Sequence, residues 1–150
     1  MNRMVASLSI ASAFAAGCAF MQCMRPAEAA VEMIAAQVIH TGEMNGDAIG
    51  PAGSSGLRSK MLVSADGATV SIQDGNTGKH LHTNANEMQF ILEGTGTMWL
   101  GDKEVRLKPG DLIVIPKGTA HGGTKPDGRT FKAIAIKTPP QAAGDTTPLN

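Results

Sequence analysis

Two histidines that stand two positions apart, His80 and His82, are the residues of this sequence best placed to do chemistry. Side chains alternate between the two faces of an extended strand, so both imidazoles would point to one side and Leu81 to the other. The small, polar residues 83–86 would then turn the chain and bring the Glu87 carboxylate toward the same point. Imidazole nitrogens and a carboxylate are ligands for divalent transition metals, so this spacing indicates a metal site.

A second segment, residues 110–121, supplies a further histidine. A glycine turn leads into the apolar run of residues 112–115. Pro116 and Gly118 would end this strand and reverse the chain, because proline cannot continue a central strand and glycine permits a tight turn. His121 would then begin the following strand.

Together, the two segments resemble the sequence motifs of the cupin family. The first motif matches at His80, His82, Glu87 and Gly94. The second motif matches at Gly110, Pro116, Gly118 and His121. Two positions depart from the family pattern: Gly75 lies one residue too close to His80, and Lys125 stands in place of an asparagine. The resemblance covers about residues 58–137.

This resemblance implies an all-β fold, namely a small antiparallel jelly-roll barrel that often forms homodimers and holds a metal at its mouth. The ligand set would be His80, His82, Glu87 and His121. Fe, Mn, Ni, Co, Cu and Zn all suit such ligands, and the residue types do not choose among them. A cupin barrel that works without metal is the alternative.

Short β-like runs recur along the chain from residue 58, separated by turn signals such as Asp66-Gly67 and Gly101-Asp102. Independently of any resemblance, this spacing predicts an all-β sandwich or barrel. The expected strands are Lys60–Ser64, Ala68–Gln73, Glu87–Leu92, Thr95–Leu100, Glu104–Leu107, Asp111–Ile115 and Thr130–Lys137.

The flanking segments are expected to be less regular. Residues 31–40 could form a first strand or a short helix, and the Gly-rich residues 41–59 are typical of a loop, either disordered or an arm that packs elsewhere. The predicted organisation is a signal peptide at 1–29, an N-terminal strand or irregular arm at 30–57, a cupin domain at 58–137 and an irregular tail at 138–150.

The residues after Glu87 are candidates for a substrate pocket. Gln89 and Ile91 follow Glu87 by two and four positions, so they would share its inward face. Trp99 is a further candidate for the pocket wall. Core packing is nevertheless the default expectation for the aromatic residues that follow the leader, Phe90, Trp99 and Phe131.

The first 29 residues have the pattern of a cleaved signal peptide. Arg3 gives a positive start, residues 4–24 carry no charge, and Ala27 and Ala29 fit the small-residue cleavage site. Cleavage after Ala29 would make the protein periplasmic or secreted. Two alternatives stay open: the segment could remain as an uncleaved anchor, or Cys18 could carry a lipid as in a lipoprotein.

Composition excludes some partners. The 150 residues include 13 basic and 13 acidic side chains, so neither a nucleic acid nor, after cleavage, a membrane is an expected partner. The only cysteines, Cys18 and Cys23, lie in the leader, so the mature chain could form no disulfide. The fourth histidine, His40, matches no motif and is expected to be a surface or structural residue.

Two functions are compatible with these residues. The first is a metal-dependent enzyme acting on a small-molecule substrate as a dioxygenase, a lyase, or an isomerase or epimerase, with Glu87 as a candidate catalytic base. The second is a non-catalytic protein that binds a small molecule or a metal ion. The residues name neither the substrate nor the metal.

Overall fold

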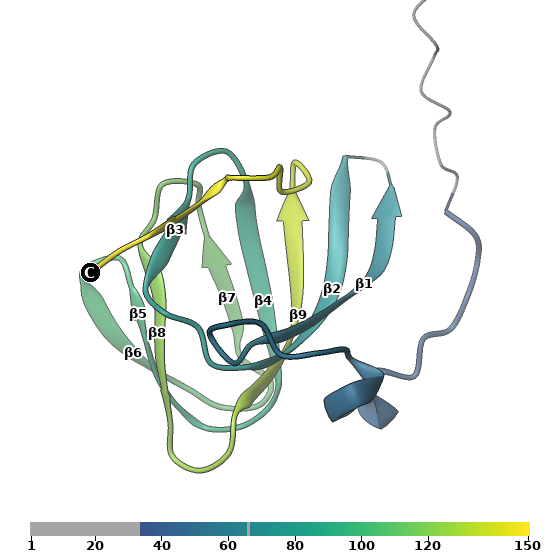
Figure 1. The fold of residues 1–150 in the computed structure, drawn as a ribbon, viewed down its shortest axis with the longest axis horizontal. Helices are drawn as coiled ribbons and strands as arrows, with labels where there is room; N and C mark the ends of the chain where they lie inside the picture. The colour runs from purple at the N-terminus through teal and green to yellow at the C-terminus, as the bar shows by residue number, and fades with distance from the viewer. Residues whose placement is uncertain (1–33, 66) are drawn as a thin grey trace, which may run out of the picture. The chain divides into compact units, whose positions relative to one another are not determined.

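Two five-stranded antiparallel sheets make up the fold in a computed structural model of the chain, which describes residues 34–65 and 67–150 (Figure 1). The first sheet has the order β1-β2-β9-β4-β7 and the second β10-β3-β8-β5-β6. The predicted all-β jelly-roll class is therefore confirmed. The strands are β1 (Arg58–Ala65), β2 (Ala68–Gly75), β3 (His80–His82), β4 (Asn86–Glu93), β5 (Gly96–Leu100), β6 (Lys103–Leu107), β7 (Leu112–Ile115), β8 (His121–Pro126), β9 (Phe131–Thr138) and β10 (Thr146–Pro148).

The inner face of β4 divides the barrel interior into an apolar part and a polar part. Its inward side chains are Glu87, Gln89 and Ile91, which lie opposite Lys137, Ala135 and Ala133 of β9. Ile91 belongs to the buried apolar cluster, whose other members are Met98, Leu107, Ile113, Ile115, Phe131 and Ala133. Polar groups therefore collect around Glu87, at the other end of the strand.

The arm before β1 packs against the barrel, which was one of the two alternatives for residues 41–59. It contains two short 3-10 helices, η1 (Thr41–Glu43) and η2 (Gly46–Ala48), followed by Ile49, which is 2% exposed. Lys60 of β1 donates a hydrogen bond of 3.1 Å to the carbonyl of Ala48. Lys132 of β9 contacts Asn45 Oδ1 at 3.0 Å, so two strands hold the arm.

Three expectations need correction. Residues 34–40 form neither a strand nor a helix. The tail is not irregular throughout, because β10 pairs with β3. Phe90 is 42% exposed and not in the core, since it alternates with the inward Gln89 and Ile91, whereas Phe131 is buried as expected.

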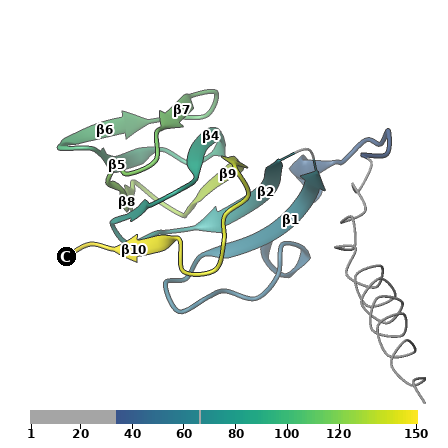
Figure 2. The same cartoon turned by 90° about the horizontal axis from the view of Figure 1, so that it is seen from above.

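From above, β1 and β2 lie on the opposite side of the barrel from β6 and β7 (Figure 2).

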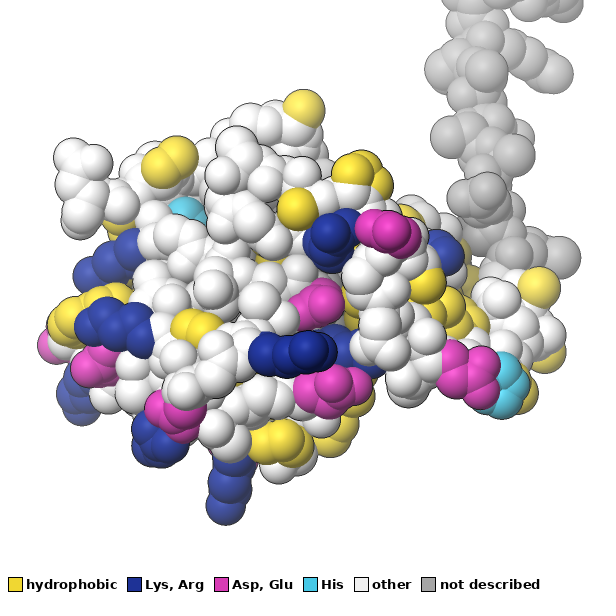
Figure 3. All heavy atoms as spheres, turned by 60° about the horizontal axis from the view of Figure 1, so that its bottom comes forward, with side chains coloured by type: hydrophobic (Ala, Val, Ile, Leu, Met, Phe, Trp, Pro, Cys, Tyr) yellow, Lys and Arg dark blue, Asp and Glu magenta, His cyan; other side chains and the backbone are white. Residues whose placement is uncertain are grey.

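The surface near Phe90 is apolar. Phe90, Leu112 and Val114 are exposed on the outer side of β4 and the edge strand β7. The homodimer that the family resemblance implies stays a prediction. On the face drawn in Figure 3, basic and acidic side chains are interspersed, in keeping with the equal numbers of each, 13 and 13.

The predictions for the leader, namely the signal peptide, cleavage after Ala29 and a lipid on Cys18, lie outside the described residues. Within residues 34–65 and 67–150, no helix is both long enough and apolar enough to cross a membrane.

The motif glycine Gly94 offers a test of the barrel packing. A Cβ at Gly94, where φ is 91°, would lie 2.6 Å from the carbonyl oxygen of Thr130, whereas at Gly110, where φ is 92°, it would meet nothing within 4 Å. We expect Gly110→Ala to cost about 1–2 kcal/mol through the backbone conformation alone. Gly94→Ala should cost a further ~1–3 kcal/mol, because backbone must move to make room.

Urea unfolding of the two variants measures this difference in the free energy of unfolding. Equal losses for Gly94→Ala and Gly110→Ala would show that the close approach of the Thr130 backbone to Gly94 is not what requires glycine there.

Candidate metal centre

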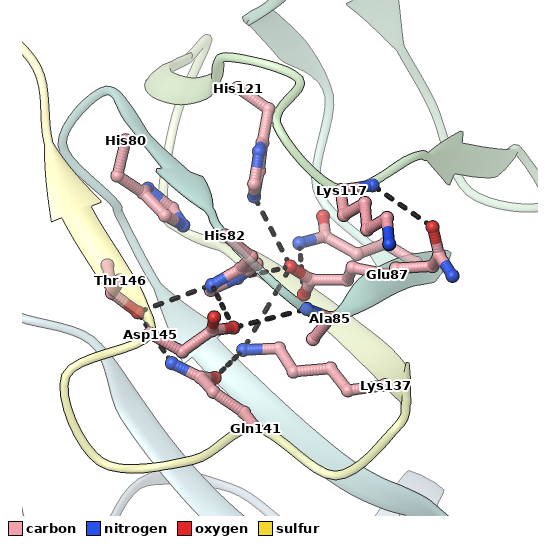
Figure 4. A network of polar contacts seen from close by, with 12 residues as sticks. His80, His82, Ala85, Glu87, Lys117, His121, Lys137, Gln141, Asp145 and Thr146 are labelled. Carbon is pink, nitrogen blue, oxygen red and sulfur yellow. Dashed lines mark hydrogen bonds and ion pairs between the residues drawn. The ribbon is translucent and has the colours of Figure 1, made fainter.

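Four side chains from three strands converge at the polar end of the barrel (Figure 4). His80 and His82 come from β3, Glu87 from β4 and His121 from β8, and His80 lies directly opposite His121 in the strand register. One ligand atom from each residue lies within 4.8 Å of those from the other three. The structure thus brings together all four residues that the sequence predicts as metal ligands.

In two of the imidazoles, the ring nitrogen that points away from the centre, Nδ1, is hydrogen-bonded to a backbone carbonyl. His80 Nδ1 donates to the carbonyl of Gly78 at 2.8 Å, and His121 Nδ1 donates to the carbonyl of Thr119 at 2.9 Å. A carbonyl oxygen can only accept, so Nδ1 carries the proton in both rings. In the neutral rings, Nε2 therefore presents a lone pair toward the centre.

His121 Nε2 and Glu87 Oε2 face each other across 3.3 Å, yet the contact does not have the geometry of a hydrogen bond, and Nε2 is a buried nitrogen without a partner. His121 is 1% exposed and Glu87 is 2% exposed, so water is largely excluded. Two facing lone pairs in a buried place are unfavourable unless a cation lies between them. The donor set therefore fits a divalent transition metal.

Glu87 is held in its ionised form. Burial alone would raise the pKa of Glu87, but the contacts with His121 and His82 and the nearby ammonium of Lys137 outweigh burial and hold that pKa well below its usual range. Gln89 Nε2 donates to Glu87 Oε1 at 2.9 Å and leaves Oε2 directed at the imidazoles. A low pKa makes a carboxylate a weak base, which favours Glu87 as a ligand over Glu87 as a catalytic base.

Burial also tunes the two basic groups at the centre. It lowers the pKa of His80, and the neighbouring imidazoles of His121 and His82 act in the same direction, so the neutral ring that a metal needs is favoured. Burial lowers the pKa of Lys137, while the carboxylates of Glu87 and Asp145 oppose that change.

The tail supplies two residues that the sequence reading missed, Asp145 and Thr146. His82 Nδ1 lies 3.3 Å from Thr146 Oγ1 and 3.8 Å from Asp145 Oδ2. Asp145 is buried and accepts hydrogen bonds from the backbone N–H groups of Asn84, at 2.7 Å, and Ala85, at 3.3 Å. Although burial would raise the pKa of Asp145, these bonds lower it. His82 Nε2 donates a hydrogen bond to Glu87 Oε2 at 2.9 Å, and a metal bound at Nε2 would displace that proton. A carboxylate beside Nδ1 favours the ring form that such a metal needs.

A cavity of about 540 Å³ opens beside the centre and is lined in part by His80, His82 and Glu87. Gln89 lines it, as predicted for a pocket residue. Ile91 and Trp99, the other two predicted pocket residues, do not line this cavity. Ile91 lies deeper, in the apolar core, and the ammonium of Lys79 lies 4.5 Å from the centre of the Trp99 ring. Trp99 points away from the interior because it neighbours the inward Met98.

Comparison with known proteins finds a family model that matches part of the chain. Residues 68–137 match the family model described as a cupin domain. An uncharacterised protein of Methanocaldococcus jannaschii is 34% identical over 67 residues, which are 45% of this chain and 54% of that protein. Acireductone dioxygenase of Exiguobacterium sibiricum is 32% identical over 88 residues, covering 54% of this chain and 49% of the enzyme. The chain thus spans about half the length of these relatives.

A solved structure from Klebsiella pneumoniae, an uncharacterised conserved protein with a double-stranded β-helix domain, superposes with a TM-score of 0.60. It is 16% identical, and the match covers 77% of this chain and 99% of that one. At this identity the likeness concerns the fold alone.

The contact of Asp145 with His82 generates a prediction. Asp145→Asn removes the negative charge behind the imidazole, so we expect metal affinity to fall by about 10–100-fold. Competition with a chelator for Co²⁺ or Zn²⁺ measures the dissociation constant.

Asp111→Asn is the matched control, because Asp111 caps an exposed turn by accepting a 2.9 Å hydrogen bond from the backbone of Lys108. Unchanged affinity in the Asp145→Asn variant, with its fold retained, would mean that Asp145 only holds the tail.

Proposed function

We propose that this protein is a metal-dependent cupin enzyme that acts on a small molecule, since residues 68–137 match the cupin domain model. The observation that carries the proposal is the unpartnered, buried Nε2 of His121 facing the Glu87 carboxylate. A divalent metal held by His80, His82, Glu87 and His121 would satisfy all four groups. The adjoining cavity is lined by three of the four residues, His80, His82 and Glu87, so a small molecule in it would lie beside the centre.

A bound metal would supply Lewis-acid chemistry at a substrate oxygen or, if it is iron, would activate O2. The dioxygenase relatives support oxygen chemistry as the first reaction class to test. Because the chain spans about half of those relatives, a lyase or an isomerase reaction belongs to the same proposal. The protein's own contribution is to fix the imidazoles through Gly78, Thr119 and Asp145 and to keep Glu87 ionised.

Metal analysis of His121→Ala tests this proposal. We expect the wild-type protein to bind one metal ion per chain. In the His121→Ala variant the metal affinity should fall by more than about 100-fold, since loss of a ligand costs more than loss of a hydrogen bond to a ligand, which costs roughly 10–100-fold. His40→Ala is the matched control, because His40 is exposed and lies outside the centre. Elemental analysis gives the metal content, and oxygen uptake with candidate diols and carboxylates gives the reaction class.

A wild-type protein that takes up no divalent metal would contradict the proposal. Metal bound without turnover of any substrate would favour the other function that the sequence allows, a non-catalytic metal-binding or small-molecule-binding protein.

Export to the periplasm or the medium belongs to the proposal as well. It is supported by the uncharged run 4–24 and by the small residues Ala27 and Ala29. We expect the exported protein to begin at Ala30, which N-terminal sequencing of the purified protein checks. An unprocessed Met1 would exclude cleavage, and a lipid on Cys18 would identify a lipoprotein.

A further inference from the structure

Two of the described lysines line the cavity, Lys79 and Lys137, and neither belongs to the metal centre; Lys137 is partly buried and lies beside Glu87. Lys137 lies on β9 directly opposite Glu87 of β4, and its side chain is 14% exposed. Its Nζ lies 4.0 Å from Glu87 Oε2, too far for a hydrogen bond, and donates to Gln141 Oε1 (Figure 4). An ammonium has three N–H donors, so Lys137 keeps donors for a molecule in the cavity.

Once a metal is bound, the charges around Lys137 would favour an anion. Two carboxylates lie near it, those of Glu87 and Asp145. Glu87 would be engaged by the metal, and Asp145 already accepts hydrogen bonds from Asn84 and Ala85. A bound divalent metal and the Lys137 ammonium together would outweigh these two carboxylates, so this end of the cavity would carry an excess of positive charge.

The rest of the cavity is suited to hydroxyl groups. Amide and hydroxyl side chains can both donate and accept hydrogen bonds, which a ligand rich in hydroxyls requires. Among the described residues that line the cavity there is no Phe or Trp, which disfavours a flat aromatic ligand. The amide and hydroxyl side chains that argue for such a ligand are Ser59, Gln73, Thr77, Gln89, Gln141 and Thr146.

We propose that the substrate is a small polyhydroxy carboxylate, such as a sugar acid, whose carboxylate accepts hydrogen bonds from Lys137 Nζ. This inference rests on the metal-dependent function proposed above and adds the class of substrate. Gln141 steadies the ammonium and in turn donates to Thr146 Oγ1, the hydroxyl that contacts His82. The tail segment thus connects the anion site to a metal ligand.

Equilibrium binding of matched acids and neutral sugars to the metal-loaded full-length protein tests the proposal. The pairs are D-glucuronate with D-glucose, D-galacturonate with D-galactose, and D-gluconate with D-glucitol. We expect the acid of at least one pair to bind about tenfold or more tightly than its neutral partner, because a charge-assisted hydrogen bond is lost in the neutral sugar.

Variants of Lys137 assign the difference to the ammonium. Lys137→Met should weaken binding of the acid about tenfold and leave the neutral partner unchanged, while Lys137→Arg keeps the charge and should restore part of the affinity. Lys125→Met is the control, because Lys125 is exposed on β8 and pairs with Glu104 at 3.0 Å. Metal content and thermal unfolding are measured first for every variant.

The outcomes distinguish a failure of the proposed substrate class from a failure of the proposed metal-dependent function. Absence of metal in the wild-type protein would overturn both. Bound metal with no preference for the acid in any of the three pairs, or a Lys137→Met variant that binds acids like the wild type, would overturn only the substrate class. Loss of metal from Lys137→Met would also overturn it, since Lys137 would then serve to support Glu87.

Discussion

The structure depends on the convergence of three imidazoles and one carboxylate on one buried point. Glu87 Oε2 lies 2.9 Å from His82 Nε2 and 3.3 Å from His121 Nε2, with the His80 ring beside them. The Nδ1 atom of each imidazole contacts either a backbone carbonyl, as in His80 and His121, or side chains of the tail, as in His82. Such a group is costly in a low-dielectric interior unless a cation joins it, so surrounding strands must hold its members in place.

Because every second residue of a strand faces inward, one strand can place apolar side chains at one end of the barrel interior and polar side chains at the other. On β4 the same inward face carries Ile91 in the core and then Gln89 and Glu87 at the site. The apolar cluster supplies the burial that stabilises the barrel. Lys137, opposite Glu87 on the neighbouring strand, lies at the boundary between the site and the open cavity.

Sequence patterns predicted the parts of this architecture that local rules govern. Strand alternation and turn signals predicted most of the strands and a common face for His80 and His82, while the resemblance to cupin motifs added His121 and completed the set of four ligands. The same rules could not place Phe90, because alternation says which residues share a face and not which face is inward. Nor could they find Asp145, whose contact with His82 joins positions 63 residues apart through strand pairing that no local spacing encodes.

The residues that complete the site extend past the stretch recognisable as a cupin domain, which ends at residue 137. A fragment trimmed to residues 68–137 would keep all four imidazole and carboxylate ligands. It would nevertheless lose Asp145, Thr146 and Gln141, as well as β1 along one border of the first sheet. Relatives aligned only over that stretch could therefore share the ligands and the backbone contacts of His80 and His121, yet differ in the tail side chains that contact His82, so differences in specificity would be sought in the tail.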